Sequence, residues 1–207
     1  RGWAHRTEPN RLDCDRKNGW WGGVAGGPGL AVRAAGKARA GMGVDAGDYD
    51  TLGGFSLAVT NFENEMMGLY HSVGNGIYAD RAPQSEVGRL TRRSLGFGCF
   101  VFDADLDGML DLLVVNGHID DSLERIRGDV HHAQAPHLFL NTGGGGFHDV
   151  AGESGAGFAR PIVGRGAAFG DFDNDGDMDV LITTNNGPAY LYRNDQLGGN
   201  RSIPFTL

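Results

Sequence analysis

The chain has 207 residues, of which 40% are hydrophobic and 9% aromatic; this is enough to bury a core and excludes disorder by composition. Glycine accounts for 36 residues, more than twice its usual share, which predicts many tight turns and an all-β chain. The net charge of −8 is concentrated in two aspartate-rich segments, 103–111 and 171–179, which excludes nucleic acid as a partner and favours a cation.

The first 40 residues are the least regular part of the sequence. The segments 9–12 and 29–40 resemble remnants of a preceding repeat, whereas residues 13–28, which contain Trp20-Trp21-Gly22-Gly23, show no strand pattern. We therefore expect residues 1–40 to form an irregular segment.

Neither the cysteines nor the start of the chain indicates a cellular compartment. Cys14 and Cys99 lie in unlike settings and have neither the spacing of a zinc site nor that of a disulfide framework. The chain begins at Arg1 without an initiator methionine or a signal-peptide core, and no apolar run approaches the ~18 residues of a membrane span. We expect a fragment that does not itself span a membrane.

Three internal repeats follow residue 40. They begin with similar glycine-rich segments, and each segment leads to an aspartate, at positions 48, 103 and 171. A short apolar run comes next in every copy, and a second run rich in aromatic residues follows it. In chain order these pairs of runs are 57–60 and 69–71, 112–115 and 138–141, and 180–183 and 190–194.

The runs within each repeat predict about four short strands. They contain four to six β-branched and aromatic residues bounded by Gly, Asn and Asp, and only residues 122–127 have helical character. Four-stranded repeats of this kind are typical of β-propeller blades, of which a ring needs roughly 4 to 8. We predict an open partial propeller with blades at 41–94, 95–163 and 164–207, the last truncated at its C-terminal side.

Two loops in the second and third repeats follow the pattern D-x-D-x-D-G-x-x-D. Alternate positions of a tight loop can bring carboxylates to one point, as Ca²⁺ requires, and the glycine allows the sharp turn. An acidic Asp-Gly hairpin would explain one aspartate but not four at fixed spacing in both loops. The predicted ligands are the side chains of Asp103, Asp105, Asp107 and Asp111, those of Asp171, Asp173, Asp175 and Asp179, and the backbone carbonyls of Met109 and Asp177.

The type of metal loop and the number of metal sites follow from comparing these two loops with an EF-hand and with the first repeat. An EF-hand loop ends in a glutamate at position 12, where this chain has Val114 or Ile182 inside a predicted strand, so an EF-hand is excluded. The first repeat has Asp48 and Asp50 but lacks acids at the fifth and ninth loop positions. We expect this loop to bind a cation weakly or not at all.

These motifs resemble known repeats. The segments 43–50, 97–115 and 166–192 are similar to FG-GAP/VCBS repeats, the calcium-loop blades of integrin α-chain propellers. Val115-Asn116-Gly117-His118, Asn185-Asn186-Gly187-Pro188-Ala189 and the Gly41-Met42-Gly43 segment resemble more narrowly the cartilage acidic protein/UnbV family of secreted propellers. The resemblance implies a Ca²⁺-stabilised binding scaffold in an extracellular, cell-surface or periplasmic location, followed by a small ASPIC/UnbV domain from about Leu207.

Other patterns leave alternatives open. Five histidines lie between residues 118 and 148, and His118 with Asp120 and Asp121 could form an acid–base or transition-metal site. Residues 152–156 resemble the nucleophile elbow of hydrolases but depart from its pattern at their last position, so they give little support to a hydrolase. Three further motifs match functional patterns that also have a simpler explanation. Arg127-Gly128-Asp129 matches an integrin-binding tripeptide but can arise by chance, and Asn200-Arg201-Ser202 is a glycosylation site only in a eukaryotic secretory pathway. Trp3, Trp20 and Trp21 could stack on sugars or be partly buried against the first repeat.

The function that the sequence favours is a non-enzymatic, calcium-binding propeller segment for cell adhesion or another contact with a protein or carbohydrate. The alternative is an envelope hydrolase or lyase with a histidine-containing site near residues 118–137. A third possibility is a partial gene product without independent activity. Open blade edges additionally predict self-association.

Overall fold

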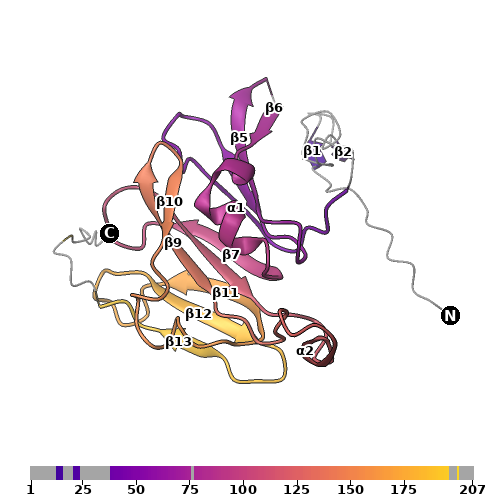
Figure 1. Ribbon diagram of the computed structural model, residues 1–207. Helices are drawn as coiled ribbons and strands as arrows, with labels where there is room; N and C mark the ends of the chain where they lie inside the picture. Colours follow the sequence, from indigo (N-terminus) through magenta and orange to yellow (C-terminus); the bar gives the residue numbers. More distant parts are fainter. Residues whose placement is uncertain (1–12, 16–20, 24–37, 76, 196–199, 201–207) are drawn as a thin grey trace.

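Three antiparallel sheets make up most of the structure (Figure 1). The computed structural model describes residues 13–15, 21–23, 38–75, 77–195 and 200. The first sheet contains β3 (Val44–Gly47), β4 (Ser56–Val59), β5 (Gly68–Gly74) and β6 (Ile77–Asp80); the second contains β7 (Gly96–Phe102), β8 (Asp111–Asn116), β9 (His137–Gly143) and β10 (Gly146–Asp149); the third contains β11 (Gly164–Gly170), β12 (Asp179–Thr184) and β13 (Tyr190–Tyr192).

Each sheet is a meander in which consecutive strands pair side by side. Short runs of β-branched and aromatic residues between glycine and asparagine turns favour this arrangement over helices. The all-β prediction of blade-like sheets is therefore confirmed, with four strands in the first two sheets and three in the described part of the third. We refer to these sheets as the first, second and third blades.

The blades stack face to face, and two hydrophobic clusters fill the spaces between them. Residues such as Ala58 and Leu69 of the first blade pack with Val101 and Leu112 of the second. The opposite face of the second blade, including Leu113, packs against Val180 and Ile182 of the third. All six residues of β8 are buried because neighbouring blades cover both of its faces. The described sheets do not close into a barrel.

Two helical segments accompany the blades. The helix α2 (Leu123–Ile126) confirms the helical character predicted at 122–127. The helix α1 (Glu86–Thr91), preceded by the 3₁₀ turn η1 (Ala82–Gln84), was not predicted, because six residues are too few to show a 3.6-residue period. No helix in the described part of the chain combines the length and the apolar character of a bilayer-spanning segment.

A two-stranded sheet lies within residues 13–28, for which the sequence pattern predicts no strands. β1 (Asp13–Asp15) pairs with β2 (Trp21–Gly23), and Asp13 lies opposite Gly23. Strands of three residues are too short to show an alternating pattern. The predicted repeat remnant at 9–12 lies outside the described residues, as does most of the one at 29–40.

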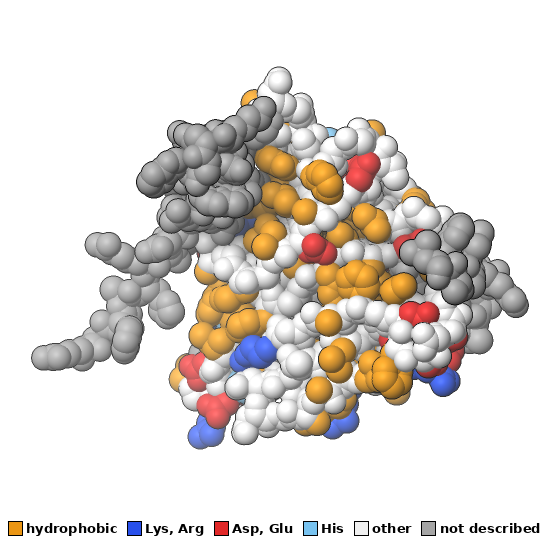
Figure 2. Space-filling model, turned by 180° about the vertical axis from the view of Figure 1, so that it is seen from behind, with side chains coloured by type: hydrophobic (Ala, Val, Ile, Leu, Met, Phe, Trp, Pro, Cys, Tyr) orange, Lys and Arg blue, Asp and Glu red, His pale blue; other side chains and the backbone are white. Residues whose placement is uncertain are grey.

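Hydrophobic side chains spread over the middle of the surface seen from behind, with only a few charged side chains between them (Figure 2). Over the described residues, large apolar side chains are exposed at Val44 and Phe55 in the first blade and at Phe169, Leu181 and Leu191 in the third. At Val44, Leu181 and Leu191 such exposure is expected where a stack of sheets ends, whereas the half-exposed Phe169 ring also packs on Phe100 and Phe102 of the second blade.

Candidate metal centre

The two aspartate loops join the first and second strands of the second and third blades. Both loops turn through the left-handed region at their fourth and sixth positions: φ is 58° at Leu106 and 90° at Gly108, and 63° at Asn174 and 98° at Gly176. Glycine adopts this conformation without steric cost, and asparagine tolerates it better than most residues. The shared motif therefore produces one shared backbone turn in both loops.

Three carboxylates converge in the loop of the second blade. Asp103, Asp105 and Asp111 each place an oxygen within 4.8 Å of the other two. Asp103 accepts the backbone N–H groups of Asp107 at 3.0 Å and Gly108 at 2.9 Å, so the loop folds around its first carboxylate. The turn itself thus brings the acids together.

The loop of the third blade repeats this arrangement. Asp171, Asp173 and Asp179 each contribute an oxygen to a group of the same size. Asp171 accepts the N–H groups of Asp175 and Gly176, both at 3.1 Å. The structure therefore brings together the side chains predicted at loop positions 1, 3 and 9.

The side chains predicted at the fifth position lie outside these converging groups. Asp107 accepts the Met109 N–H at 2.8 Å, and Asp175 accepts the Asp177 N–H at 3.0 Å, which ties both carboxylates to the loop backbone. At the seventh position, the backbone carbonyls of Met109 and Asp177 remain predicted ligands.

Burial and the charges of neighbouring carboxylates raise the pKa of Asp105, Asp111 and Asp173. Burial raises the pKa of Asp111 to about 7, against the opposing effect of hydrogen bonds from the N–H groups of Asn141 and Ala104. Desolvation and the charge of Asp107 raise the pKa of Asp105. In the other loop, desolvation and neighbouring carboxylates raise the pKa of Asp173. A bound cation would offset both effects by favouring the charged forms.

In the second and third blades, an asparagine in or just after the third strand is hydrogen-bonded to the aspartate loop. The Asn141 N–H donates to Asp111 Oδ1 at 2.8 Å, and its side-chain amide donates to the carbonyl of Tyr49 in the first blade at 2.6 Å. Asn194 donates in the same way to Asp179 and to the carbonyl of Ala104 in the second blade, both at 2.8 Å. Neither asparagine was predicted as a site residue from the sequence, although each lies at the end of an aromatic run, at 138–141 or 190–194.

The first loop keeps the backbone turn but pairs its acid with a histidine. Its fourth and sixth positions, Thr51 and Gly53, have φ values of 58° and 79°. Asp50 is buried, accepts the Ser56 hydroxyl at 3.2 Å and lies in direct contact with Nδ1 of His71. This imidazole occupies one of the carboxylate oxygens that a cation would need.

The Asp50–His71 pair predicts a pH-dependent contribution to stability. Burial raises the pKa of Asp50, but hydrogen bonds from His71, the Leu52 N–H and Ser56 outweigh it, so the pKa lies below its ordinary value. A carboxyl with a lowered pKa in the folded state stabilises the protein above its unfolded pKa, and this contribution is lost as the pH falls through the folded pKa.

We expect Asp50→Asn to lower the free energy of unfolding at pH 7 by about 1 to 3 kcal/mol, because buried His71 loses its charged partner. The difference from the wild type should be smaller at pH 3, because Asp50 is then protonated more readily in the unfolded chain than in the folded protein. Urea unfolding at both pH values in chelator measures it, with exposed Asp121→Asn as the control. A difference that does not change with pH would contradict the pairing.

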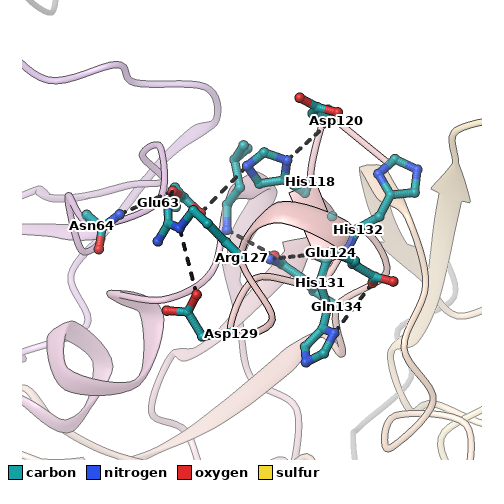
Figure 3. Close-up of polar contacts among 12 residues, drawn as sticks. Glu63, Asn64, His118, Asp120, Glu124, Arg127, Asp129, His131, His132 and Gln134 are labelled. Atoms are coloured by element: carbon teal, nitrogen blue, oxygen red, sulfur yellow. Dashed lines mark hydrogen bonds and ion pairs between the residues drawn. The ribbon is translucent and has the colours of Figure 1, made fainter. Parts of the chain in front are cut away.

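The histidines proposed as an alternative site make structural contacts within the protein (Figure 3). His118 is buried, and its Nδ1 accepts the Asp120 N–H at 3.1 Å, which leaves the Nε2 proton facing Glu63 Oε2 at 3.7 Å. His131 lies 3.4 Å from Glu124. Over the described residues, the groups of three or more potential metal ligands are the two aspartate groups.

His137 and His148 lie apart from this cluster. His137 Nδ1 is 2.6 Å from Asp149 Oδ2, and its ring stacks on Phe139, whereas His148 lies 3.4 Å from Glu86. Burial raises the pKa of Asp149, but hydrogen bonds from His137 and the Ala151 N–H outweigh it and lower the pKa. The structure therefore does not bring these histidines together with His118.

In the tripeptide Arg127-Gly128-Asp129, the arginine side chain is paired within the molecule. The Arg127 guanidinium donates to Glu63 at 2.7 Å and lies 3.7 Å from Asp129 (Figure 3). A cavity of about 280 Å³ opens beside these side chains. Its described lining contains no histidine and consists of Glu63, Asn64, Arg92, Arg93, Arg127, Asp129 and Val130.

Together, the fold and the loops define a class of protein. It is a repeat protein in which the loop between the first two strands of each β-sheet blade has the same backbone conformation. Within this class, residues 127–182 match the family model of the FG-GAP-like repeat. The matched segment includes β9, β10, β11 and the aspartate loop of the third blade. No curated protein matches the chain.

Proposed function

We propose that the chain is a calcium-binding blade scaffold that makes contact with a protein or carbohydrate and has no catalytic activity of its own. The observation that carries the proposal is the convergence of three carboxylates in each of two loops with the same backbone turn. The same three loop positions converge in both loops, which is expected if the carboxylates share a function and not if acidic residues are scattered over the surface.

The donor chemistry favours Ca²⁺ among divalent cations. Ca²⁺ binds six to eight oxygens in flexible geometry, whereas Mg²⁺ needs a near-ideal octahedron and retains several waters. Asp103, Asp105 and Asp111 offer oxygens only, and the Met109 carbonyl is the further ligand predicted from the loop motif. The raised pKa of Asp111 supports binding of a cation at this loop, because a cation would offset the cost of charging this buried carboxyl.

The role of the cation in this proposal is structural. Asp103 lies directly after β7 and Asp111 begins β8, so a shared ion would tie the first two strands of the blade together. The repeat match supports a scaffold for interactions, and the resemblance of the sequence to secreted propellers supports an extracellular, cell-surface or periplasmic location. The narrower cartilage acidic protein/UnbV assignment belongs to the same proposal.

Calcium is expected to raise the thermal midpoint of unfolding. Binding only to the folded state adds about 2.7 kcal/mol per site at a hundredfold excess over Kd. Differential scanning calorimetry in chelator and then in increasing Ca²⁺ measures the gain, with Mg²⁺ as the ion control. The double variant Asp105→Ala/Asp173→Ala should lose the gain, whereas exposed Asp121→Ala should keep it.

An unchanged calcium response in the double variant would refute these ligands. Equal responses to Ca²⁺ and Mg²⁺ would refute calcium selectivity. Circular dichroism of the same samples establishes that each variant is folded before the comparison is made.

A further inference from the structure

The contact between the first and second blades depends on a glycine and a threonine. Thr60 Oγ1 accepts the Gly43 N–H at 2.8 Å, and its hydroxyl donates to the Phe97 carbonyl of the second blade at 2.8 Å. A Cβ on Gly43 would lie 2.0 Å from the Phe97 carbonyl oxygen, so only glycine allows β7 to approach this closely. Gly43 and Thr60 together therefore form a docking element for the next blade.

The third blade carries the same docking element on an open face. Thr183 lies as far after Asp171 as Thr60 lies after Asp48. Its Oγ1 accepts the Gly166 N–H at 3.0 Å, as Thr60 accepts that of Gly43. If Gly166 carried a Cβ, the only described atom within 4 Å of it would be Thr183 Oγ1. Gly166 and Thr183 are both exposed.

The apolar surface around this element is also open. Leu181 of the third blade is 40% exposed, whereas Leu113, at the same position of the second blade, is fully buried beneath the third. Ala58, at this position of the first blade, is fully buried beneath the second. We call the open surface formed by Gly166, Leu181, Thr183 and Leu191 the tail face.

The first blade presents the counterpart of this surface. β7 reaches the first blade through Phe97 and Cys99: the Phe97 carbonyl accepts from Thr60, and the Cys99 sulfur lies 3.7 Å from the Ala58 carbonyl. The same repeat positions in the first blade are Met42 and Val44, which are 41% and 65% exposed. We call the surface formed by Met42, Val44 and Ala46 the head face.

We propose that the tail face of one copy receives the head face of a second copy, with Val44 against Leu181 and the Thr183 hydroxyl donating to the Met42 carbonyl. The occupant is a second copy because the chain itself presents both halves of the contact that it uses internally. The described blades of two copies number six, which lies within the roughly 4 to 8 that close a propeller ring. A closed dimer buries both pairs of faces, which an open head-to-tail chain does not.

Sedimentation velocity of the full chain over a range of concentrations tests the proposal. The wild type should form a dimer, and Val44→Lys and Leu181→Glu should each raise the dimer dissociation constant at least about tenfold, because each sets a charge against an apolar surface. Ile126→Lys, at a 76% exposed position in α2, is the matched control and should leave the dimer unchanged.

Mixing the two interface variants gives the decisive comparison. In a mixed dimer, one contact pairs Lys with Glu and the other is wild type, so equimolar Val44→Lys and Leu181→Glu should restore the dimer that neither forms alone. A wild type that stays monomeric at all concentrations, variants that dimerise as well as the wild type, or a mixture that stays monomeric would each overturn the proposal. Circular dichroism confirms the fold of each variant, and the test does not depend on calcium binding.

Discussion

Phe139→Ala should lower the free energy of unfolding by about 3 to 5 kcal/mol. Phe139 is fully buried in β9, where it belongs to the hydrophobic cluster between the first and second blades and stacks on the ring of His137. Removal of the ring leaves a cavity that the paired strands on both sides cannot collapse to fill, so the lost burial and the cavity add to each other.

Denaturant unfolding of Phe139→Ala and Phe172→Ala measures this effect with a matched control. Phe172 is the same residue type, but 67% of it is exposed, so its replacement should change stability by less than about 0.5 kcal/mol. Equal losses in the two variants would contradict the placement of Phe139 in the core between the blades.

Gly117→Ala should cost about 3 kcal/mol by separating the second and third blades. A Cβ at this position would lie 2.6 Å from the Gly164 nitrogen and 2.8 Å from the Val163 carbonyl carbon. These are backbone atoms of the strand entering the third blade, so no side-chain rotation relieves the clash and the blades must move apart.

Gly152→Ala is the control for this variant, because a Cβ there meets no atom within 4 Å. Thermal unfolding should give a lower midpoint for Gly117→Ala and a midpoint close to that of the wild type for Gly152→Ala. Two similar midpoints would mean that the blades do not approach each other at Gly117.

The repeated elements could be predicted from the sequence because their signals are local. The run at 112–115 became β8, the run at 180–183 became part of β12, and the loop motif predicted both acidic turns. These features depend on residue types at fixed short spacings, such as the glycine at the sixth loop position, whose backbone conformation the turn itself requires.

The remaining features depend on contacts between residues that are far apart in the chain. The pairing of Asp50 with His71 and the bond from Asn141 to Tyr49 become apparent only when strands are placed side by side. The separation of Asp105 from Asp107 within one loop depends on where each carboxylate points after the turn. None of these leaves a periodic pattern along the sequence.

Asn141 and Asn194 each donate a hydrogen bond to the loop of the preceding blade, so the loop of one blade depends on the blade that follows it. The side-chain amide of Asn194 donates to the Ala104 carbonyl, and the Ala104 N–H donates to Asp111. Local opening at the end of the third blade therefore releases a backbone group next to the carboxylates of the second. We therefore expect amide hydrogen exchange in the loop of the second blade to increase when the third blade opens locally, so that neighbouring blades open as coupled units.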